Sequence, residues 1–162
     1  MEMEELGILT RITGVEEIYI EALDGTQTIA DSPDLFGSYL DPWFKEEDHN
    51  KPGPATNACF MDIYEVVHKS NFQGMLGALK SDLDELVTSQ AQLIYFCRKY
   101  PHKLHKRGYY NFFLMQDKDG YYIANVTVRV ESISIYRYDL ERKGNWNGLD
   151  RHHLLVPRCI AF

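Results

Sequence analysis

The residues best suited to chemistry lie together in one basic and aromatic stretch, residues 98–110. Its candidate binding residues are Arg98, Lys99, His102, Lys103, His105, Lys106, Arg107 and Tyr109. Cations can neutralise phosphate groups, and aromatic rings can stack on bases, so this mixture predicts a site for RNA or another phosphate-bearing ligand. The simpler interpretation, which the sequence favours, is a solvated helix end and connector whose positive charge complements acidic residues elsewhere in the chain.

The histidines of this stretch raise two further hypotheses, a metal site and an acid–base pair. His102 and His105 are three residues apart, and His152 and His153 would join them if the strands align. Four cations flank the first pair and would repel a dication, so we expect no metal site and no cofactor there. They are Lys99, Lys103, Lys106 and Arg107. Acid–base cleavage of RNA by paired histidines stays open as the catalytic alternative.

The strongest charge asymmetry lies outside this stretch, in an acidic first third. Residues 1–50 hold thirteen acids against Arg11 and Lys45, a net charge of −11, whereas residues 86–116 hold five bases and no acid. An acidic surface can attract a basic partner. The chain also lacks the short motifs of nucleotide-binding proteins and common hydrolases. We therefore expect first a non-catalytic protein-binding role for the acidic third, with RNA or phosphate binding, or RNA cleavage, through residues 98–110 as the alternative.

Length and composition predict one cytoplasmic domain. At 162 residues the chain can bury a core without disulfides or metals. The acidic start has no signal-peptide pattern, and no apolar run approaches the length that spans a bilayer, so no membrane partner is expected. The three cysteines, Cys59, Cys97 and Cys159, are an odd number without close spacing, which favours a reducing compartment.

Hydrophobic periodicity predicts two or three helices within residues 59–100. Apolar residues recur at three- and four-residue steps from Phe60 to Leu79, and again over residues 89–100, until Pro101 ends the pattern. The preceding segment, residues 41–58, is rich in proline and charge and predicts a long loop that is either functional or mobile.

Residues 109–140 alternate in hydrophobicity and predict consecutive antiparallel strands, with a hairpin turn at residues 117–120. The second strand should point five side chains inward: Tyr122, Ala124, Val126, Val128 and Val130. The apolar phase flips near Glu131 and again near Ile135, which predicts a turn or bulge at each place. The expected fold is α+β: an antiparallel sheet over about 109–157, covered on one face by the helices, with a strand at Glu17–Ala22 added at an edge.

Two segments resemble a group of small bacterial proteins of unknown function. They are "TSQAQLIYFCRKYPHKLHKRGYYNFF", residues 88–113, and the tail "RHHLLVPRC", against patterns of the type TQxQI…F…LR…GYxTFFL and RHRxVVP. The chain departs from that pattern at Lys103-Leu104-His105, where the group has a Trp-Leu pair, and at Cys159, where it has Gln. The resemblance covers about the C-terminal half. It implies a stand-alone domain and carries over no site and no substrate.

Overall fold

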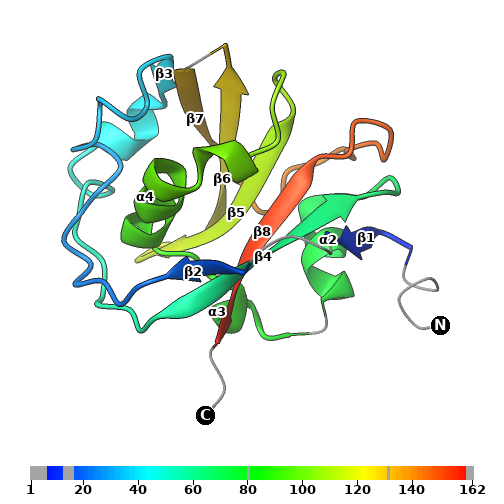
Figure 1. Ribbon diagram of the computed structural model, residues 1–162, viewed down its shortest axis with the longest axis horizontal. Helices are drawn as coiled ribbons and strands as arrows, with labels where there is room; N and C mark the ends of the chain where they lie inside the picture. The colour runs from blue at the N-terminus through cyan, green and yellow to red at the C-terminus, as the bar shows by residue number, and fades with distance from the viewer. Residues whose placement is uncertain (1–6, 13–16, 80, 131, 160–162) are drawn as a thin grey trace.

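The fold is α+β, built on a mixed sheet whose strands come from both halves of the chain (Figure 1). The computed structural model describes residues 7–12, 17–79, 81–130 and 132–159. The strands are β1 (Leu9–Arg11), β2 (Ile18–Ile20), β3 (Tyr39–Leu40), β4 (Cys59–Val66), β5 (Tyr110–Asp117), β6 (Gly120–Arg129), β7 (Ser132–Asp139) and β8 (His153–Cys159). The α-helices are α2 (Phe72–Ala78), α3 (Leu83–Leu86) and α4 (Gln90–Lys99), and the 3₁₀ helices are η1 (Pro42–Lys45) and η2 (Pro101–Lys103).

The expectation of a purely antiparallel sheet is wrong. The strand order is β1-β4-β8-β5-β6-β7-β3, with β2 also paired to β4. The meander β5-β6-β7 is antiparallel as predicted, but β8 pairs in parallel with β5, and β3 pairs in parallel with β7. The reason is connectivity: the chain leaves β7, crosses the sheet through residues 140–152 and enters β8 between β4 and β5. The alternation of one strand carries no information about such a crossover.

Residues 59–66, predicted to be helical, form strand β4 instead. Phe60, Ile63 and Val67 satisfy helical spacing by coincidence, because both faces of β4 are covered and apolar residues fall on each. The β-branched and aromatic residues of this segment favour a strand. The predicted strand near the N-terminus is present as β2, which pairs with Met61, Phe60 and Cys59 at the edge of β4. The predicted helical region therefore begins only at Phe72.

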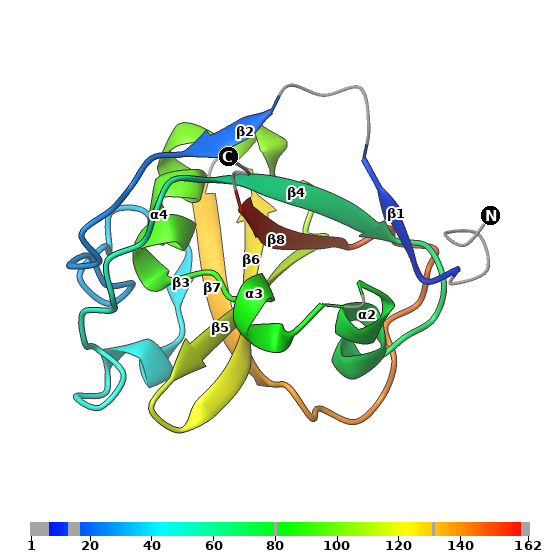
Figure 2. The same cartoon turned by 90° about the horizontal axis from the view of Figure 1, so that it is seen from below.

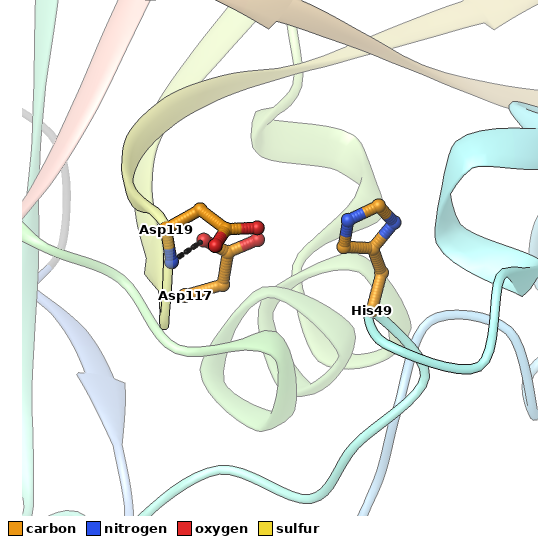
Figure 3. Close-up of side chains that lie close together, drawn as sticks. All are labelled: His49, Asp117 and Asp119. Carbon is orange, nitrogen blue, oxygen red and sulfur yellow. Dashed lines mark hydrogen bonds between the residues drawn. The ribbon is translucent and has the colours of Figure 1, made fainter.

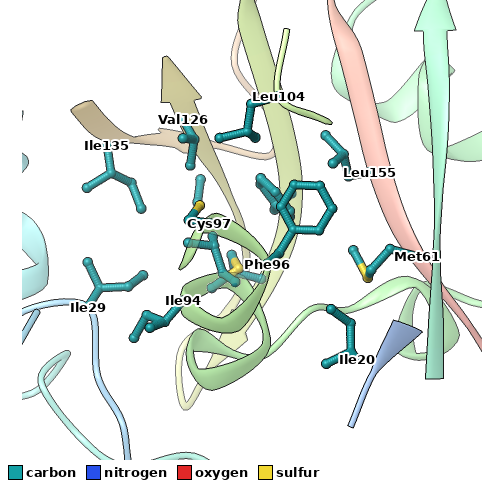
Figure 4. Close-up of a cluster of buried hydrophobic side chains, with 14 of the residues drawn as sticks. Ile20, Ile29, Met61, Ile94, Phe96, Cys97, Leu104, Val126, Ile135 and Leu155 are labelled. Carbon is teal, nitrogen blue, oxygen red and sulfur yellow. The ribbon is translucent and has the colours of Figure 1, made fainter. Parts of the chain in front are cut away.

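Helices cover both faces of the sheet, rather than one as expected (Figure 2). Alternate residues of β5 show the division: Phe113 and Met115 pack with α4, whereas Phe112 and Leu114 pack with α2 and α3. Figure 4 shows the α4 side, where Phe96 and Cys97 meet Val126 from the sheet. Since both faces are covered, β5 and β6 are buried along most of their length.

The two predicted phase flips have different outcomes. Val130, expected to point inward, is 98% exposed and has a φ of +55°, because β6 has already ended at Arg129. The first flip is thus a turn between β6 and β7; Glu131 lies outside the described residues. At the second, near Ile135, β7 pairs with β6 without interruption. The apolar phase changes there because Ile135 packs on the α4 side and Tyr138 on the α2 side.

Residues 41–58 are mostly loop, as predicted, with η1 inside them. Phe44 of η1 is fully buried against Tyr122, and Thr56 pairs with Leu23, so both parts of the loop are attached to the core. Among the described residues, no helix is long and apolar enough to cross a lipid bilayer.

A matched pair of substitutions on β6 tests the register. Val126→Asp places a charge in the α4-side core and should lower the free energy of unfolding by more than about 3 kcal/mol. Val130→Asp makes the same chemical change in an exposed turn and should change it by less than about 1 kcal/mol. Urea denaturation of both variants measures the difference, and similar losses for the two would show that the register is wrong.

Candidate binding site around His105

The parallel pairing of β8 with β5 gathers three histidines from separate parts of the chain. His153 lies opposite Asn111 in the sheet. The His105 ring stacks on the His153 ring with centroids 4.4 Å apart, and on the Tyr109 ring at 4.7 Å. His152 turns to the other side and stacks on Tyr110 at 4.8 Å. Of the four histidines considered from the sequence, His105 and His153 meet, whereas His152 packs on the opposite side, against Tyr110.

The buried side chain of Asn111 fixes the loop that carries His105. Its Oδ1 accepts a hydrogen bond from the His105 amide at 2.8 Å, and its Nδ2 donates to the His105 carbonyl at 3.0 Å. The same Nδ2 donates to the Val126 carbonyl, and the Asn111 amide donates to Asn125 Oδ1. A fully buried amide with these partners has one orientation. It ties the loop rigidly to β5 and β6.

Burial favours the neutral form of two rings of the cluster. The Tyr110 amide donates to His152 Nδ1 at 3.1 Å, so that nitrogen accepts, and His152 Nε2 faces Asp150 at 3.6 Å. His153 Nε2 faces Glu65 at 3.8 Å, while its buried Nδ1 has no hydrogen-bond partner among the described residues. Burial lowers the pKa of both histidines, and repulsion from neighbouring imidazoles adds to the effect. The pKa of His153 falls to about 4.

Cations of the predicted stretch flank His105 in the chain, and Lys106 and Arg107 are exposed. Within the described part of the chain, Lys103, Lys106 and Arg107 form no ion pair. The Arg129 guanidinium lies against Gly108, within 3.6 Å of the point where a Cβ atom would stand. Arg107 and Gly108 both have positive φ values, +63° and +79°, which give the loop its sharp turn into β5. The result is a basic loop, residues 103–108, beside half-buried rings.

Three of the predicted residues lie outside this group. Arg98 pairs with Asp34 at 3.0 Å, which supports the simpler interpretation that it neutralises the acidic third. The Lys99 ammonium contacts the Tyr95 hydroxyl at 3.1 Å. The His102 ring is exposed, and its aromatic contact is Tyr100 at 6.3 Å. The cations at the end of α4 are thus used in contacts within the protein, whereas those of the loop 103–108 form no ion pair with any described residue. In the sequence the two parts form one continuous basic run.

Sequence reasoning missed Asn111 and Arg129 as members of this site. Asn111 lies in an apolar strand, and a polar residue among Tyr110, Phe112 and Phe113 was the available signal, because a buried amide needs partners. Arg129 ends a strand far along the chain and offers no such signal. Trp146 anchors the returning loop: its backbone pairs with Ser70, and its ring contacts Phe112.

The comparisons with known proteins add no relative. No protein-family model, no curated protein and no solved structure matches this chain. The resemblance to small bacterial proteins therefore stays a prediction, and the site is interpreted from its own geometry.

The lowered pKa of His153 predicts a specific pH dependence of stability. The unfolded chain binds a proton at about pH 6.5, whereas folded His153 binds it only at about pH 4. Stability is therefore fully present above pH 6.5 and falls as the pH drops toward 4. The loss of stability, relative to neutral pH, should reach about 2–3 kcal/mol at pH 4.5.

His153→Phe keeps a stacking ring without the titration, so its free energy of unfolding should fall less than that of the wild type between pH 7 and pH 4.5. His102→Phe, at an exposed histidine, is the matched control and should follow the wild type. Urea denaturation at both pH values measures the difference. If the free energy of unfolding falls by the same amount between pH 7 and pH 4.5 in His153→Phe and in the wild type, the pH dependence does not come from His153.

Proposed function

We propose that the basic loop 103–108, with His105 and Tyr109, binds single-stranded RNA through its phosphates and one stacked base. The observation that carries the proposal is a set of cations, Lys103, Lys106 and Arg107, that form no ion pair with any described residue and lie in the chain next to a half-buried ring pair. Cations track the phosphate backbone, and a tyrosine face accepts any base. The hydrogen bonds between Asn111 and the His105 backbone support this role. They already hold the loop in place, so the loop loses little conformational entropy on binding.

The same geometry favours binding over RNA cleavage. Acid–base cleavage needs two titratable groups on either side of the reacting phosphate. His105 and His153 stack directly on each other, which leaves no space between them, and His153 is buried with a pKa of about 4. At neutral pH the imidazolium form of His153, which would act as the general acid, is therefore scarce. Neither a metal nor a cofactor is invoked at this loop.

Charge reversal of the loop should abolish RNA binding. Lys103→Glu, Lys106→Glu and Arg107→Glu together remove the phosphate contacts, so the fluorescence anisotropy of a labelled single-stranded RNA should no longer rise. Tyr109→Ala should weaken binding about tenfold through lost stacking, and Tyr109→Phe should retain it. For the wild type, three phosphate contacts give a slope of log K against log salt of about −2.

The matched control reverses three cations at the far end of β5, namely Lys45, Lys51 and Lys118. It changes the net charge by the same amount but should retain binding. If the control loses as much affinity for RNA as the loop variant, the affinity depends on net charge and the loop is not a specific site. If the wild type binds no RNA at low salt, the proposal is wrong.

A second candidate function is capture of a basic protein by the acidic third. Its support is a run of exposed acids at Glu46, Glu47 and Asp48 beyond η1. Several other acids of this third are already used within the chain: Asp34 pairs with Arg98, Glu17 with Arg158, and Asp41 caps η1. In the run at 46–48, Glu46 lies 3.7 Å from His49 and Asp48 pairs with Lys118 at 3.5 Å, but all three side chains are exposed and consecutive, which is what suits this run to a basic partner.

Capture of oligolysine tests this second candidate. Glu46→Lys with Glu47→Lys should reduce binding of the immobilised peptide, and binding by the wild type should fall sharply with salt. Glu85→Lys with Glu141→Lys alters two other exposed acids by the same charge and serves as the control. Equal losses in both double variants would show a general charge effect and would exclude a local site.

We place either function in the cytoplasm. Cys97 is fully buried in the core, where desolvation raises the pKa of its thiol to about 12, so it serves as an apolar packing residue. A cysteine used for packing, as Cys97 is, suits a reducing compartment.

A further inference from the structure

The end of β5 opposite the basic loop carries a second cluster of polar side chains. His49, from the loop after η1, faces Asp117 and Asp119, which flank the β5–β6 turn (Figure 3). One ligand atom of each residue lies within 4.8 Å of the others. We propose that these three side chains bind a divalent transition-metal ion, with zinc the best match. This site is independent of the RNA-binding proposal.

The His49 ring is held with one nitrogen free for a metal. Its Nδ1 lies 2.8 Å from the Trp43 carbonyl oxygen, which can only accept, so Nδ1 carries the proton. The ring also stacks on the Trp43 indole at 3.6 Å, and its side chain is only 10% exposed. The Nε2 lone pair is then left on the side of the ring that faces the two carboxylates (Figure 3). A backbone carbonyl bound to the other ring nitrogen is the usual support of a metal-binding histidine.

Asp117 offers an oxygen that the fold leaves unsatisfied. Its Oδ1 accepts a hydrogen bond from the Asp119 amide at 2.8 Å, but its Oδ2 is buried and has no hydrogen-bond partner among the described residues. A buried carboxylate oxygen without a partner is costly. The nearby Lys118 ammonium does not supply the missing charge, because it turns to Asp48 at 3.5 Å. A bound cation would satisfy Asp117 Oδ2.

The ligand set and the surroundings favour a transition metal. Calcium and magnesium prefer oxygen ligands alone, whereas one imidazole with two carboxylates suits zinc. Zinc bonds of about 2.0–2.2 Å need ligand atoms about 3.4 Å apart. Asp119 is exposed and can rotate to close that gap. His49 and Asp117 also line a pocket of about 590 Å³, so a water-filled position on the ion would face the pocket, as in open metal sites.

Zinc titration of chelator-treated protein, followed with a competing dye, tests the site. The wild type should bind one zinc ion, and His49→Gln and Asp117→Asn should each weaken binding by at least about tenfold. Asp119→Asn repeats the test at an exposed turn residue, where the substitution should not impair folding. Glu47→Gln is the matched control, because it removes one acid close to His49 in the chain and leaves the Lys118–Asp48 pair intact, and it should leave the affinity unchanged. Cobalt should give the visible absorption of a four- or five-coordinate ion, lost in His49→Gln.

Four results would overturn the proposal. The first is no zinc binding by the wild type at micromolar concentrations, and the second is binding that His49→Gln and Asp119→Asn do not weaken. The third is loss of binding in His105→Gln with retention in His49→Gln, which would move the ion to the histidine cluster at the other end of β5. Tighter binding of calcium or magnesium than of zinc would likewise exclude the transition-metal assignment.

Discussion

The insertion of β8 between β4 and β5 is the constraint on which the rest of the structure depends. It joins the N-terminal strands, through seven paired residues with β4, to the meander β5-β6-β7, through the parallel pairing with β5. Leu154 and Leu155 of β8 are fully buried and face opposite sides of the sheet, so one strand contributes to both cores. The same register sets His153 beside Asn111 and thereby builds the histidine cluster.

The parts of the fold that depend on neighbouring residues were predictable, and those that depend on distant ones were not. The β5–β6 hairpin and α4 follow from local alternation, turn residues and the Ser89 capping box. The strand β4 was mistaken for a helix because burial on both faces hides the alternation of a strand. The parallel β8 and the helices on both faces arise from tertiary pairing, for which periodicity within one segment gives no signal.

The candidate site was likewise predictable only where it depends on residues that are close together in the chain. The residues of the basic stretch were identified from type and spacing, but their division into a paired Arg98 and a free loop depends on Asp34, far away in the chain. The proposed metal site shows the same limit. Asp117 and Asp119 read as turn residues, and only the fold brings His49 to them from the loop that follows η1. A three-residue cluster from two segments has no signature in either segment alone.

The net charge of −7 argues less strongly against RNA binding once charges are placed in the fold. The basic loop precedes β5, whereas Asp117, Asp119 and the acidic run at 46–48 lie at its other end. Eight extended residues separate the two ends by about 24 Å. The Debye length at physiological salt is about 8 Å. A phosphate placed at the basic loop would therefore be screened from the acidic end, and its affinity would depend on the charges nearby: the cations of the loop, and Asp150 and Glu65 beside the histidine cluster.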